Sequence, residues 1–240
     1  MQKEQWIELL INQCKNLNIY ITESQLQQFY LYMKILQKWN ENINLTAILE
    51  DGDILQKHFI DSLTILPYIN NEDNVIDVGT GAGFPGIPIK IVKEDIKVTL
   101  LDSLNKRVKF LQEVIDNLAL SNIDTIHNRA EDAGRNLDLR EKFDIAVSRA
   151  VAPLNVLVEY LMPLVKKGGQ CICMKGNNIE EELANSKKAV HILGGKLEKI
   201  DELYLPQSDI KRNIIIIRKI EDTSSKYPRK AGVPSKNPIE

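Results

Sequence analysis

Hydrophobic residues in the first part of the chain recur at the spacing of an amphipathic helix. The apolar positions that share one helical face are Leu26, Phe29, Tyr30, Met33, Leu36 and Trp39. Thr22 and Gln25 stand at the spacing of a capping box, which predicts that this helix begins near Glu23. A second apolar pattern of the same spacing stops at Pro67. We therefore expect residues 1–70 to form a helical N-terminal cap.

From residue 74 onward, short runs rich in β-branched residues alternate with helical patterns. The runs that predict strands are Val75–Val78, Val98–Leu101, Ile123–His127, Phe143–Ser148, Cys171–Met174, Leu197–Tyr204 and Ile214–Arg218. The patterns that predict helices are Pro88–Lys93, Lys106–Leu118, Pro153–Val165 and Ile179–Leu193. This alternation predicts an α/β, Rossmann-like fold over residues 71–220, with a seven-stranded, mostly parallel sheet and helices on both faces.

The composition is that of an ordinary globular protein. Of its 240 residues, 43% are hydrophobic and 27% are charged, which excludes the collagen-like, disordered and disulfide-scaffold classes. The formal net charge is -2, so the chain is not a polycation. Any contact with nucleic acid therefore has to come from a local basic patch.

The sequence favours a cytoplasmic protein without a metal centre. Charged residues interrupt the N-terminal apolar stretch, so it lacks the apolar core of a signal peptide, and no apolar run approaches the roughly 20 residues that cross a bilayer. The three cysteines form no Cys-x-x-Cys pair, which suits a reducing compartment. His58, His127 and His191 have no metal-ligand spacing, and we expect them to be structural or surface residues.

The segment 75–88 reads VIDVGTGAGFPGIP and joins a predicted strand to a predicted helix. This is the setting of a nucleotide-binding turn, in which Gly79 and Gly81 let a ligand approach the backbone closely. A dinucleotide fingerprint would have glycine where Phe84 stands, so the spacing instead resembles the first motif of S-adenosylmethionine-dependent methyltransferases. Asp77 lies within reach of the ammonium group of that cofactor. The alternative is that its carboxylate only braces the turn.

Two further groups of residues follow the next two predicted strands. Asp102 ends the second strand, where a carboxylate can accept both hydroxyls of a ribose; the alternative is a helix-capping role with Ser103. After the third strand, the backbone amide of Ala130 and the carboxylate of Glu131 are candidates for reading the edge of an adenine. Ligand positions at three successive strand ends together predict a nucleoside cofactor.

Arg149 stands at the end of the fourth predicted strand. The Asn/Asp-Pro-Pro-aromatic tetrad of enzymes that methylate exocyclic amines is missing there, and so is the cysteine that pyrimidine-C5 methylation needs. The cation of Arg149 is a candidate for binding the cofactor carboxylate, a phosphate or guanine O6. The alternative is an interhelical salt bridge.

Five segments of the chain carry a more specific pattern. They are WNENINLT from Trp39, HFIDSL from His58, DVGTGAGFPG from Asp77, SRAVA from Ser148 and YPRKAGVP from Tyr227. Together they resemble the bacterial 16S ribosomal RNA guanine-N7 methyltransferases, the glucose-inhibited division protein B family, over nearly the whole chain. The resemblance implies S-adenosyl-L-methionine as cofactor, 16S rRNA within the small ribosomal subunit as substrate and 7-methylguanosine as product. It places cofactor contacts on Gly79, Phe84, Ala130, Glu131 and Arg149.

The implied reaction needs no general base, because guanine N7 carries a lone pair and no proton. N7 can attack the sulfonium methyl directly and in line, so catalysis consists mainly of orientation and electrostatics. Our hypothesis is that Arg149 and Lys175 are the catalytic residues and hold the guanine or its phosphate. An Arg149→Ala variant is then expected to lose most of its turnover while the fold survives.

The end of the chain is locally basic. Residues 211–240 hold eight lysines and arginines against three acids. We expect residues 221–240 to form a basic tail on or near the RNA-binding face, in which Arg229 and Lys230 contact RNA and three prolines exclude any regular element. The alternative is a merely solvated terminus. Deletion after Thr223 is expected to weaken rRNA binding and to leave cofactor binding unchanged.

Three other functions remain open from the residues alone. An NAD-dependent oxidoreductase would account for the glycines and Asp102, but not for Phe84. A ribosome-assembly factor would bind rRNA and leave no methyl group, and a small-molecule methyltransferase would have no use for the basic tail. We expect a monomeric rRNA methyltransferase.

Overall fold

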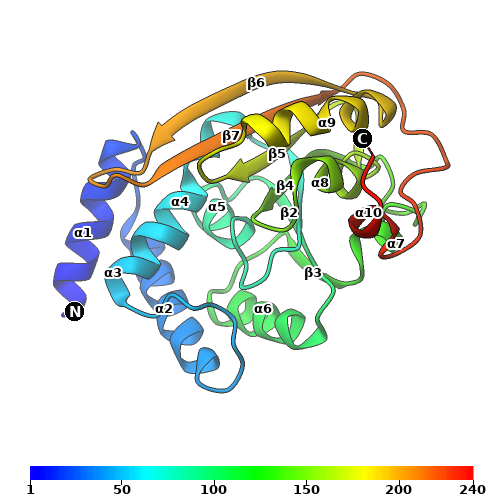
Figure 1. The fold of residues 1–240 in the computed structure, drawn as a ribbon. Coiled ribbons are helices and arrows are strands. Elements are labelled where there is room, and N and C mark those ends of the chain that lie inside the picture. Colours follow the sequence, from blue (N-terminus) through cyan, green and yellow to red (C-terminus); the bar gives the residue numbers. More distant parts are fainter. Residues whose placement is uncertain (240) are drawn as a thin grey trace.

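A computed structural model describes residues 1–239 of the chain (Figure 1). Its helices are α1 (Lys3–Asn16), α2 (Glu23–Asn40), α3 (Asp51–Ile54), η1 (Leu55–Ile60), α4 (Asp61–Leu63), η2 (Leu66–Tyr68), α5 (Gly86–Val92), α6 (Asn105–Asn117), α7 (Ala130–Ala133), α8 (Leu154–Leu161), α9 (Glu180–Ile192) and α10 (Val233–Lys236). Its strands are β1 (Asn74–Val78), β2 (Lys97–Asp102), β3 (Ile123–His127), β4 (Phe143–Arg149), β5 (Val165–Lys175), β6 (Gly195–Tyr204) and β7 (Lys211–Lys219). Every strand and helix predicted from the sequence is present.

The seven strands form one sheet in the order β3-β2-β1-β4-β5-β7-β6. The strands β1 to β5 pair in parallel, whereas β7 is antiparallel to both of its neighbours. The prediction of a seven-stranded, mostly parallel sheet is confirmed. The chain reverses its direction of travel across the sheet between β1 and β4, and open α/β sheets bind their ligands beyond the carboxyl ends of such strands.

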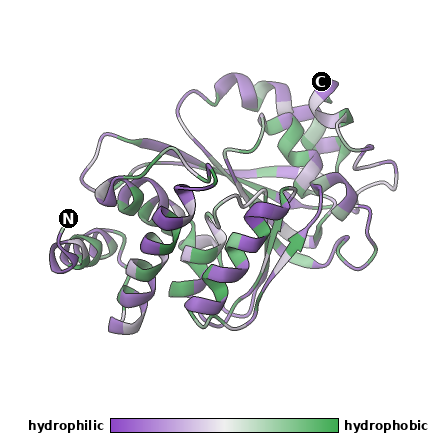
Figure 2. Cartoon of the chain, turned by 90° about the horizontal axis from the view of Figure 1, so that it is seen from below, coloured by the Kyte–Doolittle hydropathy of each residue, from purple (hydrophilic) through white to green (hydrophobic). Residues whose placement is uncertain are grey.

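Successive residues of the strands pack on opposite faces of the sheet. Val75 and Val147 share one core with the N-terminal helices, α5 and α6, whereas Ile76 and Ala146 pack with α8 and α9 on the other face. Figure 1 shows these two layers on either side of the sheet, and Figure 2 shows apolar and polar residues alternating along the same helices. The helical cap over residues 1–70 is therefore one layer of a shared core.

The start of α2 agrees with the predicted capping box. The Thr22 hydroxyl accepts a hydrogen bond from the Gln25 amide, and the Gln25 side chain accepts one from the Thr22 amide, at 3.3 and 2.9 Å. These two bonds satisfy donors that a helix end leaves free, so α2 begins at Glu23. The predicted apolar face of α2 packs inward, with Phe29 and Met33 fully buried.

Two predictions about element boundaries are wrong. The predicted helix 153–165 ends at Leu161, and Val165 instead begins β5, where it pairs with Phe143 ahead of a register shift. The tail was expected to lack regular structure, yet Val233–Lys236 forms the short helix α10. Pro234 lies in the first turn of α10, where the missing proline N–H removes no helical hydrogen bond.

Candidate active site

A hollow of about 230 Å³ lies beyond the carboxyl ends of β1, β2 and β3. Its lining residues are Val78, Gly79, Leu101, Asp102, Ser103, Asn128, Arg129, Ala130, Glu131, Val151, Tyr160, Gly232 and Ser235. The fold thus brings Gly79, Asp102, Ala130 and Glu131 to one hollow, whereas Asp77, Gly81, Phe84 and Arg149, also singled out from the sequence, are not among its lining residues. It also adds Tyr160 from α8 and two residues of the C-terminal tail, which sequence reasoning missed.

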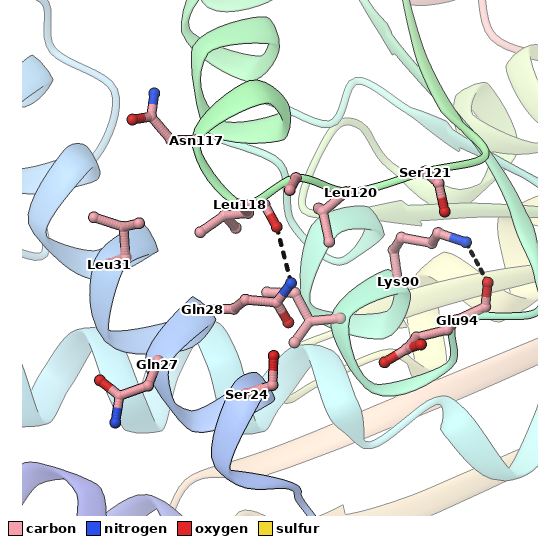
Figure 3. A pocket seen from close by; sticks show the side chains of 12 residues that line it. Ser24, Gln27, Gln28, Leu31, Lys90, Glu94, Asn117, Leu118, Leu120 and Ser121 are labelled. Carbon is pink, nitrogen blue, oxygen red and sulfur yellow. Dashed lines mark hydrogen bonds between the residues drawn. The ribbon is translucent and has the colours of Figure 1, made fainter.

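A larger hollow, of about 440 Å³, lies between α2, α5 and the end of α6 (Figure 3). It opens beside the loop before β3, and therefore at the amino ends of the strands. Its one buried cation, Lys90, already donates to the carbonyl oxygens of Glu94 and Ile96, and Gln28 donates to Leu118. The larger hollow thus lies at the wrong end of the strands for a ligand site, and its polar groups already have partners. Both observations favour the smaller hollow as the cofactor site.

The glycine turn after β1 is tightly packed. Gly79 has φ +70°, and a Cβ atom there would lie 2.6 Å from the Val151 side chain, so only glycine fits. The Gly79 amide donates to the Leu101 carbonyl, and the Gly81 amide donates to Asp102 Oδ2 at 2.9 Å. The turn from β1 is thereby fixed to the end of β2.

Asp77 is buried beneath this turn. Its Oδ2 accepts hydrogen bonds from the Thr80 hydroxyl at 2.6 Å and the Gly86 amide at 2.8 Å, so the bracing role considered from the sequence is real. Its Oδ1 is buried and accepts no hydrogen bond within residues 1–239. Burial raises the pKa of Asp77 to about 6, although both hydrogen bonds and the charge of Arg149 oppose that rise. A cationic ligand group would satisfy the free oxygen.

Asp102 both orders the backbone and lines the hollow. Besides the Gly81 amide, it accepts a hydrogen bond from the Leu104 amide at 2.9 Å, and the Arg107 guanidinium lies 3.4 Å from Oδ2. Each carboxylate oxygen has two lone pairs, so these contacts leave room for ligand hydroxyls. The helix-capping alternative is wrong, because the N-cap of α6 is Leu104 and no side chain caps this helix; Asp102 instead braces the turn and lines the hollow.

Arg149 leaves the end of β4 and lies in a cluster built by the helical cap. Its Nη1 donates to Asp61 Oδ2 at 3.0 Å and to the Lys57 carbonyl, and Nη2 lies 3.0 Å from His58 Nδ1. Asp61 is buried and also accepts a hydrogen bond from Arg212 Nε at 2.9 Å. Two guanidinium groups thus share one carboxylate, and the charge of Asp77 also acts on Arg149.

His58 and Phe84 stack beneath Arg149. Their rings lie 4.4 Å apart and nearly parallel, and the guanidinium carbon of Arg149 lies 5.0 Å from the centre of the Phe84 ring. Because arginine only donates, His58 Nδ1 must accept, and the proton is assigned to Nε2, 2.9 Å from the Thr46 hydroxyl. Burial and the neighbouring Arg149 lower the pKa of His58 to about 3, so the ring stays neutral.

Sequence reasoning missed the roles of Asp61, His58 and Arg212. The signal for the first two was the segment HFIDSL, in which His58 and Asp61 stand three apart on one helical face. His58 was expected to be structural or a surface residue; it is buried and contacts Arg149. Arg212 had no comparable signal, because β7 approaches Asp61 only in the folded chain.

Lys175 and Arg229 already have partners in the structure. The Lys175 amine lies 2.6 Å from both Glu182 Oε2 and the Ala152 carbonyl. Arg229 lies against the fully buried Glu159, with which its side chain forms three hydrogen bonds, the shortest at 2.6 Å. Lys230 forms no ion pair within residues 1–239. Of the predicted RNA contacts, Lys230 is thus the one whose charge is available.

The family model and the curated relatives that match this chain all name the same family. The model of the family described as "rRNA small subunit methyltransferase G" matches residues 25–215. The ribosomal RNA small subunit methyltransferase G of Acetivibrio thermocellus is 55% identical, covering 97% of this chain and 96% of its own length. The proteins of that name from Alkaliphilus oremlandii and a Clostridium botulinum strain are 52% and 48% identical, covering 97% and 98% of this chain and 98% and 100% of their own lengths.

Solved structures show the same fold at much lower identity. TYW2 of M. jannaschii, in complex with AdoMet, is 17% identical with a TM-score of 0.53 and covers 68% of this chain and 76% of that one. A SAM-dependent methyltransferase from Aquifex aeolicus is also 17% identical with a TM-score of 0.53, and covers 70% and 94%. Within residues 1–239 no helix is long and apolar enough to span a membrane, and no group of His, Cys, Asp and Glu is arranged to hold a metal ion.

Proposed function

The chain belongs to the rRNA small subunit methyltransferase G family, and from this premise we propose that it methylates N7 of a guanine in 16S rRNA, with S-adenosylmethionine as methyl donor. The observation that carries the proposal is the joint placement of Gly79, Asp102 and Glu131 around one hollow at the switch point of the sheet. Family membership sets the oxidoreductase alternative aside. We further propose, as expected from the sequence, that the protein acts as a monomer in the cytoplasm.

The residues of the hollow fit this cofactor. Asp102 is suited to accept the ribose hydroxyls, the turn at Gly79 to pass close beneath the ligand, and Ala130 and Glu131 to meet the adenine edge. Asp77 lies beneath the turn and does not line the hollow, but its Oδ1 is buried and accepts no hydrogen bond within the described residues, so it suits the ammonium group directly or through water. When bound, S-adenosylmethionine supplies an activated methyl group on a positively charged sulfur.

The residues beside the hollow are suited to orient the acceptor. Guanine N7 carries no proton, so no side chain has to remove one. Of the five N–H groups of Arg149, three are used by Lys57, Asp61 and His58, and the others remain for an acceptor on the ligand. We assign Arg149 to the reacting groups, and Phe84 to its support, because the Phe84 ring stacks on His58 and packs against the guanidinium of Arg149.

Lys175 is proposed to act through the loop that follows β4. Its amine holds the Ala152 carbonyl, and its partner Glu182 accepts a hydrogen bond from the Leu154 amide at 3.0 Å. Both contacts fix the segment that carries Val151 over Gly79. Lys175 thus shapes the entrance of the site, while Lys230 is the proposed contact to the RNA backbone.

Nucleoside mass spectrometry on small-subunit rRNA tests the proposal. Small subunits from cells that lack this protein are incubated with the purified chain and S-adenosylmethionine. New 7-methylguanosine is expected with the natural chain and with Asp124→Asn, an exposed acid on β3, and strongly reduced with Asp102→Ala. No methyl gain despite cofactor binding would contradict it and favour an assembly factor or a small-molecule substrate.

A further inference from the structure

We propose that the C-terminal segment, residues 224–239, is a wall of the cofactor site, and that the ion pair of Arg229 with Glu159 positions it there. This rests on the proposed function, because it takes the hollow beyond β1 to β3 as the place where S-adenosylmethionine binds. Gly232 and Ser235 line that hollow, and both come from this segment. Figure 1 shows α10 lying next to α7 and α8, whose residues complete the wall.

The first attachment of the segment lies inside the hollow itself. The Gly232 amide donates a hydrogen bond to Glu131 Oε1 at 2.8 Å, and Glu131 is the acid predicted to meet the adenine edge. The other oxygen of this buried carboxylate accepts no hydrogen bond within residues 1–239, so it remains for a ligand. One carboxylate is therefore placed to hold the segment with one oxygen and the cofactor with the other.

The second attachment is the ion pair with Glu159. Glu159 lies in α8 and is fully buried. Its carboxylate accepts hydrogen bonds from the backbone amide of Arg229, at 2.7 Å, and from the guanidinium of Arg229. A buried carboxylate left without its cation is costly, so this pair fixes the position of the chain firmly. Only two residues separate it from Gly232.

Further polar contacts hold the beginning of the segment. Arg135 donates to the Pro228 carbonyl and Arg140 donates to the Tyr227 carbonyl, both at 2.8 Å. Both arginines follow α7, which also provides Glu131. The segment is thus attached to the element that bears the adenine-side residues, and its position and that of the cofactor are expected to depend on each other.

This inference changes an expectation drawn from the sequence. Deletion after Thr223 was expected to leave cofactor binding unchanged, but it would remove Gly232 and Ser235 from the hollow. The segment would then act in cofactor binding as well as in contacts to RNA. Its basic residues lie on both sides of its two pocket residues, with Lys230 before Gly232 and Lys236 after Ser235.

Calorimetric titration with S-adenosylmethionine, without RNA, tests the proposal. Arg229→Gln is expected to raise the dissociation constant about tenfold, and Arg229→Lys to restore part of the loss. Arg218→Gln is the matched control, because Arg218 forms a similar ion pair with Glu198 on the exposed edge of the sheet. It is expected to leave the dissociation constant unchanged. An equal affinity of Arg229→Gln and the natural chain would overturn the proposal.

Two measurements guard against misfolding of the variant. The double variant Glu159→Gln/Arg229→Gln removes the ion pair without leaving a buried charge, and is expected to show the same loss of affinity. In the natural chain, hydrogen exchange of the amides in residues 224–239 is expected to slow when the cofactor is added. Unchanged exchange despite tight binding would overturn the proposal. If the natural chain and Asp102→Ala bind S-adenosylmethionine with the same affinity, the cofactor does not bind in this hollow, and the proposed cofactor site is itself wrong.

Discussion

The two ends of the chain pack beside the carboxyl ends of the strands through different kinds of contact. The helical cap buries large apolar side chains against the sheet and delivers His58 and Asp61 to Arg149. The C-terminal segment is held by hydrogen bonds and the ion pair of Arg229 with Glu159, packs Ile239 into the second core, and delivers Gly232 and Ser235 to the hollow. One end forms a whole layer of the core, whereas the other enters the core with Ile239 and is otherwise held by polar contacts.

This difference predicts how each end responds to change. Apolar burial is spread over many residues, so the cap is expected to stay folded until the whole molecule unfolds. Polar attachments act at single points and depend on charge, so the C-terminal segment is expected to detach locally, with the core intact. Substitutions in the cap should therefore appear first in stability, and substitutions in the segment first in ligand binding.

The largest effect is expected for Phe59→Ala in the cap. Phe59 is fully buried and its ring packs against Trp6, Phe29 and Tyr32, so removing it should cost about 3–5 kcal/mol of unfolding free energy. Urea denaturation followed by circular dichroism and by tryptophan fluorescence measures this loss. Both signals should change together. A separate early transition of the cap would contradict the shared core.

Asp61→Asn is expected to have the next largest effect. The change leaves Arg149 and Arg212 without their shared carboxylate, and breaking a buried pair of this kind costs about 3 kcal/mol. Methylation should fall as well, because Arg149 loses its orientation. Asp53→Asn, which breaks an exposed pair with Lys57, should change stability by less than about 1 kcal/mol. Normal methylation by Asp61→Asn would contradict the positioning role.

The sequence was sufficient to predict the sheet, because each strand has a local signal. The four isoleucines at 214–217 predict a strand buried on both sides, and all four are buried in β7. The glycine turn and Asp102 were also predictable, since their positions follow from being at strand ends. The local sequence pattern is therefore enough to predict the position of a site residue that directly follows its strand in the chain.

Contacts between distant segments were not predictable in this way. Nothing near Arg229 in the sequence indicates that Glu159, 70 positions earlier, would be its partner. Arg149 and Asp61 meet across 88 positions, and only the folded cap brings them together. A basic residue in a basic tail is expected at the surface, but a buried carboxylate nearby changes that outcome.

A pH-dependent effect of intermediate size is expected at Asp77. The pKa of Asp77 is raised to about 6 by burial, so this carboxyl becomes protonated in the folded protein as the pH falls below 6. A protonated Asp77 no longer attracts an ammonium group, so cofactor affinity should fall about tenfold for each pH unit below that value. Titrations from pH 5 to pH 8 measure this. Asp77→Asn should bind weakly with little dependence on pH; a parallel profile for both chains would exclude Asp77.

The smallest effect is expected for the double variant Lys226→Gln/Lys230→Gln in the C-terminal segment. Neither lysine forms an ion pair within residues 1–239, so the change should leave both stability and cofactor affinity unaltered. Each lost phosphate contact should reduce the slope of log affinity for RNA against log salt by roughly 0.7. Lys15→Gln, an exposed lysine at the far end of the molecule in α1, should leave that slope unchanged. If the double variant keeps the slope of the natural chain, these lysines are only solvated. The segment would then serve the cofactor site alone, and the contrast would be between an end that lines the hollow and an end that positions Arg149 beside it.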